Sequence, residues 1–115
     1  MESILTSIKK LLGIAEEYEH FDSDIIMHIN SVFTILTQLG VGPQKGFSIK
    51  DEDAIWSDFI DPTRHDIESV KSYMYLKVKL LFDPPLSSAV MESMNRMINE
   101  FEWRLNVTAD STETG

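Results

Sequence analysis

The sequence predicts an all-α protein, a small bundle of about four to five helices with a long loop after the second helix and an extended C-terminal tail. Apolar residues recur at helical spacing in four segments. Glycine and proline lie between these segments, where they interrupt regular structure. A chain of 115 residues can bury one core but not two. We therefore expect one domain over residues 1–106 and a flexible tail over residues 107–115.

The first helix is predicted over residues 3–12. Ile4, Ile8 and Leu11 form one apolar stripe, and Lys9 and Lys10 suit the negative end of the helix dipole. Gly13 is placed to end the helix. The acidic and aromatic residues 14–21 are compatible either with a turn or with a continuation of the helix.

The second helix, within residues 21–42, has the strongest signals. Asp22 or Ser23 can cap its start, and Asp24 places negative charge in its first turn. Gly40 and Gly42 end it. Its apolar residues repeat at steps of three and four, which predicts a buried face. The signature residues of this helix are Phe21, Asp22, Ile25, Ile29, Asn30, Phe33, Leu36 and Leu39.

Two further helices are predicted after a loop over residues 40–61. The helix over residues 65–82 carries two apolar stripes, which predicts burial against the core and against a second subunit. Pro84 and Pro85 end it. The last helix, over residues 87–105, is expected to point Val90, Met94, Met97, Ile98, Phe101 and Leu105 inward. The polar residues after Val107 have nothing to bury and are expected to be disordered in a free monomer.

No catalytic, metal or cofactor site is predicted. The chain has no cysteine, and of its three histidines only His28 pairs with a nearby acid, Asp24, on one helix face. A metal site needs three or four ligands. Phosphate loops and nucleophile elbows are missing. The net charge of -9 argues against a groove that grips phosphates. We expect a soluble, non-enzymatic protein with no membrane partner, made in the cytoplasm.

The order and spacing of several segments over residues 4–106 resemble the head-tail connector (adaptor) proteins of tailed bacteriophages and prophages. The segments are Phe21-Asp22, Ile25, Ile29-Asn30, Phe33, QLGVG at 38–42, Trp56, Tyr73, KLLFDPP at 79–85 and EWRLN at 102–106. The resemblance implies a virion protein of the neck. It would form a ring under the portal, expected to be a dodecamer, and bind the portal protein and the next neck or tail protein, a stopper or tail completion protein.

The resemblance also implies places for these contacts. The candidate assembly loop comprises Gly40, Val41, Gly42, Phe47, Ile49, Trp56 and Phe59. Aromatic residues often anchor subunit interfaces, and the candidate subunit interface comprises Tyr73, Tyr75, Leu76, Leu80 and Trp103. The candidate portal-docking tail begins with Leu105, Asn106, Val107 and Thr108. Genome DNA would pass through the lumen without specific binding, so we expect a net negative channel wall.

A small acidic protein that mimics DNA and inhibits a DNA-binding enzyme is the alternative. Such a mimic would space its acids regularly along an exposed face. Here the acids gather instead in runs over residues 16–24 and 51–68, at caps and loops. The sequence therefore favours the connector.

Overall fold

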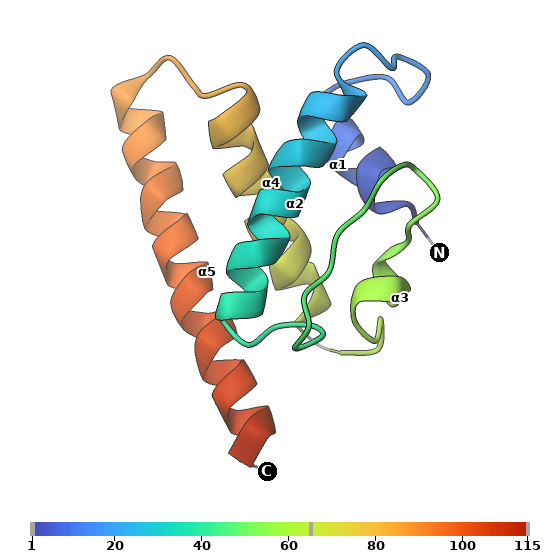
Figure 1. The fold of residues 1–115 in the computed structure, drawn as a ribbon. Helices are drawn as coiled ribbons and strands as arrows, with labels where there is room; N and C mark the ends of the chain where they lie inside the picture. Colours follow the sequence, from blue (N-terminus) through green and yellow to red (C-terminus); the bar gives the residue numbers. More distant parts are fainter. Residues whose placement is uncertain (1, 65, 115) are drawn as a thin grey trace.

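The computed structural model describes residues 2–64 and 66–114, with the side chains of the last helix described as far as Ala109 (Figure 1). Five helices form within these residues, and the predicted all-α class is confirmed. His65, at the predicted start of the fourth helix, and Gly115, at the end of the tail, lie outside the described residues. The helices are α1 (Ile4–Leu11), α2 (Asp22–Gln38), α3 (Trp56–Phe59), α4 (Ile67–Phe82) and α5 (Ser88–Thr114).

The first helix begins and ends where its sequence signals lie. The Oγ atom of Ser3 accepts a hydrogen bond from the backbone N–H of Thr6 at 3.2 Å and so caps α1. Gly13 follows with a φ of +82°, the left-handed conformation that ends many helices. Residues 14–21 form turns rather than a continued helix, which settles the alternative that the sequence left open.

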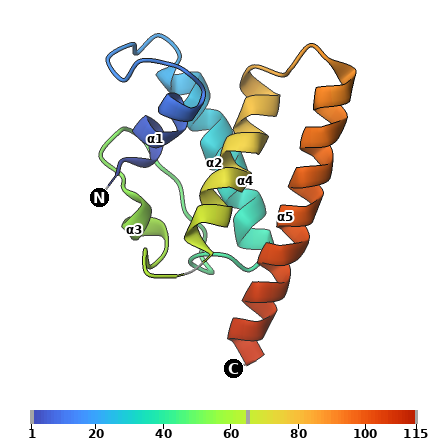
Figure 2. The ribbon, with the colours of Figure 1, turned by 180° about the vertical axis from the view of Figure 1, so that it is seen from behind.

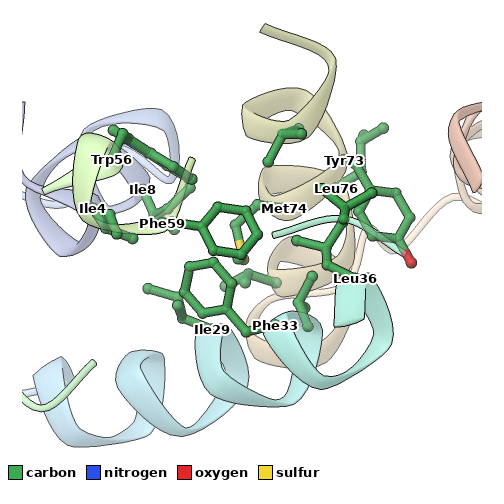
Figure 3. Packing of buried hydrophobic residues seen from close by; sticks show 14 of the residues in the cluster. Ile4, Ile8, Ile29, Phe33, Leu36, Trp56, Phe59, Tyr73, Met74 and Leu76 are labelled. Carbon is green, nitrogen blue, oxygen red and sulfur yellow. The ribbon is translucent and has the colours of Figure 1, made fainter. Parts of the chain in front are cut away.

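The core lies between α1, α2, α3 and α4 (Figure 3), and buried residues of α5 join it from the far side of α4. The predicted stripe of α2 is buried there, with Ile25, Ile29, Phe33 and Leu36 fully covered. The expected cap of α2 is wrong, because Phe21 precedes the first turn and no side chain caps it. The carboxylate of Asp22 is instead engaged by a lysine of α1.

The fourth helix is packed on two sides by helices of the same chain. One side packs on α2 and α1, and α5 of the same chain lies along the other (Figure 2). Tyr73 on α4 donates a hydrogen bond from its hydroxyl to Oε2 of Glu102 on α5 at 2.7 Å. Tyr73 and Leu76 are therefore buried within the chain, and a contact of α4 with a second subunit stays a prediction.

The last helix differs from the prediction in length and in its inward face. It continues to Thr114, nine residues beyond the predicted end at Leu105. Extending an established helix costs far less than starting one, so polar residues can follow without a buried stripe. Val90 and Met97, both expected to point inward, are exposed, whereas Met94, Ile98 and Leu105 are buried as expected.

A side-chain amide holds the long loop against α2. Asn30 Nδ2 donates to the carbonyl oxygen of Ile49 at 2.9 Å, and Asn30 Oδ1 accepts from the backbone N–H of Ile49 at 2.8 Å. The amide thereby pairs with both polar groups of one residue, as a neighbouring strand would. The partly extended piece around Ile49 is stable without a sheet for this reason.

Asn30→Ala is expected to lower the free energy of unfolding by about 1–3 kcal/mol, because both backbone groups of the buried Ile49 lose their partner. The matched control is Asn99→Ala, the same change at an exposed position of α5, for which a change within about 0.5 kcal/mol is expected. Urea unfolding of both variants measures the difference. Equal effects would show that the amide does not hold the loop.

Candidate functional site: assembly surfaces

A buried lysine shapes the connection between α1 and α2. Lys9 is only 2% exposed, yet its ammonium group has three partners at 2.8 Å. It donates to the backbone carbonyls of Glu16 and Tyr18 and pairs with Oδ1 of Asp22. The ammonium group thus makes two hydrogen bonds to main-chain carbonyls and one ion pair, although Oδ1 of Asp22 accepts no hydrogen bond. One feature of the sequence indicates that Lys9 is buried. It follows Leu5 by four residues, which places it on the buried face of α1.

The connection held by Lys9 brings the two acidic runs of the sequence together. Glu19 and Asp22 line a shallow hollow of about 400 Å³ together with Asp51 and Glu52 of the long loop. Lys50 is the one basic residue among its lining residues. Within the described residues, no group of three or more acids or histidines is arranged to hold a metal ion. These four residues, Glu19, Asp22, Asp51 and Glu52, are here called the acidic surface.

The ends of α1, α2 and α4 enclose a cleft of about 600 Å³, here called the apical cleft. Its walls are mainly apolar, and the rings of Phe21 and Phe82 meet edge to face at 5.2 Å between centroids. Asp24 and His28, the pair singled out in the sequence, both line it, as does Asp83. The remaining lining residues are Leu12, Ile14, Met27 and Leu81.

A second surface runs along the side of α5 that α4 does not cover. Trp103 is 68% exposed, and its neighbour Arg104 is 60% exposed. Met97, Glu100, Phe101 and Arg104 line a small hollow of about 150 Å³ on this side. Large exposed apolar residues grouped on one helix are typical of interaction surfaces. We call this the outer α5 face, and its residues are Val90, Met97, Trp103, Arg104 and Val107.

Most aromatic members of the candidate assembly loop belong to the core. Trp56 is fully buried and donates from Nε1 to the Oγ atom of Ser7 at 2.9 Å. Phe59 is buried too, and Phe47 packs on it with 5.3 Å between ring centroids. These side chains therefore do not project towards a partner. Val41 and Ile49 are also buried, while Gly40 and Gly42 take positive φ angles at the start of the loop.

The residues of the candidate subunit interface also differ in how far they are buried. Tyr73 and Leu76 are buried, Tyr75 and Leu80 are partly buried against the core, and only Trp103 is largely exposed. Burial raises the pKa of the Tyr73 hydroxyl far above its usual value, and the Glu102 carboxylate beside it raises that pKa further. Tyr73 thus stays neutral and joins α4 to α5 within one chain.

The candidate portal-docking tail starts inside the fold. Leu105 is buried, and Nδ2 of Asn106 donates to the carbonyl oxygen of Leu39 at the end of α2, at 3.3 Å. Val107 is exposed and Thr108 is partly buried. The tail is therefore a continuation of α5 that is anchored at its base.

Comparison with known families gives one match. A family model described as phage connector protein matches residues 4–112, from the first residue of α1 almost to the end of α5. Comparisons with curated proteins and with solved structures find no match. Within the described residues, no helix is long and apolar enough to cross a membrane.

Proposed function

We propose, since the chain belongs to the phage connector protein family, that it is a non-enzymatic protein of the virion neck. It forms a ring under the portal, extends the DNA channel, and joins the head to the next neck or tail protein. The family match over residues 4–112 carries this proposal, because it spans the whole helical bundle.

A closed ring repeats one contact between two different faces of the same subunit. The chain offers two surfaces that are unlike each other: the apical cleft, formed by three helix ends, and the outer α5 face, formed by exposed side chains of one helix. They lie on different elements, so both are open to neighbours at once. This supports assembly into a ring.

The acidic surface suits the wall of a DNA channel. Carboxylates repel phosphates at short range, so DNA can slide past them without being held. Acids that are far apart in sequence, such as Glu19 and Asp51, line the same hollow there. A ring that turns this surface towards its lumen has the net negative channel that the sequence predicts.

The end of α5 is the proposed portal contact. Deleting residues 107–115 is expected to weaken binding to purified portal protein at least about tenfold while leaving the monomer folded, because Leu105 stays in place. Pull-down on immobilised portal and light scattering measure the binding, and circular dichroism with thermal melting checks the fold. The control Asn106→Ala keeps the full length and removes only the bond to Leu39.

Unchanged portal binding by the folded truncated chain would overturn the assignment of the tail. A full-length chain that neither binds portal nor assembles, but inhibits a DNA-binding enzyme, would overturn the connector function in favour of a DNA mimic.

A further inference from the structure

We infer that Arg104 of one subunit enters the apical cleft of a neighbouring copy and pairs there with Asp24. The inference rests on the proposed function, because a contact between copies is what closes the ring. Beyond ring formation, the inference names the two faces that meet, which are the apical cleft and the outer α5 face. It also names the charged pair that fixes how these faces align.

The apical cleft has the chemistry that binds a guanidinium group. Asp24 lies at the cleft and makes no ion pair among the described residues. The rings of Phe21 and Phe82 form aromatic walls beside it. A carboxylate supplies charge-assisted hydrogen bonds to arginine, and aromatic faces attract the planar cation. The cleft therefore favours arginine over an acidic or a purely apolar side chain.

Arg104 is free to change partners. Its Nη2 atom lies 2.6 Å from Oε1 of Glu100 on the next turn, and both side chains are more than half exposed. Such an exposed pair on a helix surface contributes little to stability. Asp24 is exposed at the cleft, and a neighbouring copy that covers it removes water from around the carboxylate and so strengthens its pairing with Arg104. Arg104 also stands next to the exposed Trp103, and tryptophan and arginine are the residues most enriched where interface energy is concentrated.

The two surfaces cannot meet within one chain. Glu102 bonds to Tyr73, which places Arg104 beside the middle of α4, whereas the cleft is at the end of α4. Tyr73 precedes Phe82 by nine residues, or roughly 13 Å along a helix. Figure 2 shows the same arrangement, with the C-terminal half of α5 running away from the ends of α2 and α4 that border the cleft.

A second copy is the occupant that fits both sides of the contact. The cleft offers an acid without a counter-charge and apolar walls, and the outer α5 face offers an arginine among exposed apolar residues. Because each subunit carries one of each, the contact repeats head to tail and generates a ring when the rotation closes.

Charge reversal tests the pair. Asp24→Arg and Arg104→Glu are each expected to raise the dissociation constant for self-association at least about tenfold, because like charges would face each other. The double variant should restore association to within about threefold of the wild type. An equimolar mixture of the two single variants should also assemble, because each then finds its complement in the other. Sedimentation velocity over a concentration series measures all four.

The matched controls reverse exposed charges elsewhere, with Asp53→Arg in the long loop and Arg96→Glu two turns earlier on α5. Both should assemble as the wild type does. If both single variants, Asp24→Arg and Arg104→Glu, still assemble as the wild type does, the proposed pair is wrong. The pair is also wrong if the double variant stays dissociated. Neither result contradicts the connector function. A wild-type chain that stays monomeric both alone and with portal protein overturns the inference and the ring together.

Discussion

Lys9→Met is expected to lower the free energy of unfolding by about 3–5 kcal/mol, because it removes one partner of a buried ion pair. Methionine fills a similar volume but donates no hydrogen bond. The substitution leaves the Asp22 carboxylate without its cation and the carbonyls of Glu16 and Tyr18 without their donor. A stability of the usual size for a small domain would be reduced by a large fraction.

The neighbouring Lys10 provides the control. It is exposed on the same helix, so Lys10→Met should change the stability by no more than about 0.5 kcal/mol. Chemical unfolding monitored by circular dichroism gives both values. Adding Asp22→Asn to Lys9→Met should recover part of the loss, since the unpaired charge is then gone. A Lys9 variant as stable as the Lys10 variant would show that the ammonium network does not hold the connection.

Gly42→Ala is expected to cost about 2–5 kcal/mol. Gly42 has a φ of +85°, where a side chain costs about 1–2 kcal/mol. A Cβ atom there would also lie 2.7 Å from Cζ of Phe59, and closer still to Cε1. Phe59 is buried in the core, so its ring cannot simply move away, and overpacking adds about 1–3 kcal/mol.

Gly13 separates these two contributions. Its φ of +82° is nearly the same, but a Cβ atom there meets nothing within 4 Å. Gly13→Ala should therefore cost only the conformational part, about 1–2 kcal/mol. The difference between the two variants, measured by thermal and urea unfolding, isolates the contact with Phe59. Equal losses of stability in the two variants would mean that the core around Phe59 rearranges to accommodate the added methyl group.

The helices were predictable because their signals are local. The stripe of Ile25, Ile29 and Leu36 and the stop at Gly13 depend on residues a few positions apart, and the structure confirms both. The roles of the aromatic residues were not predictable in this way. Trp56 and Tyr73 have the composition of interface anchors, but whether such a side chain faces a partner or the core depends on segments far away in sequence.

The same limit applies to charges and to helix ends. The sequence assigns Lys9 to the helix dipole, whereas its actual partners come from a connection whose conformation no periodic pattern encodes. The polar end of α5 has no apolar stripe, so its helix went unpredicted beyond Leu105. The apical cleft depends on three helix ends meeting and has no counterpart in any single segment.

Lys9 contacts the main chain of the segment between α1 and α2, and it makes little use of the side chains that this segment exposes. Two of its three partners are main-chain carbonyls, which every amino acid supplies, so the hold of Lys9 on Glu16 and Tyr18 does not depend on which side chains these two residues carry. Glu16, Glu17 and Glu19 are exposed and can be exchanged at little structural cost. A lineage that keeps Lys9 and Asp22 can therefore alter the charge of this segment in response to a new partner while the bundle beneath it stays the same.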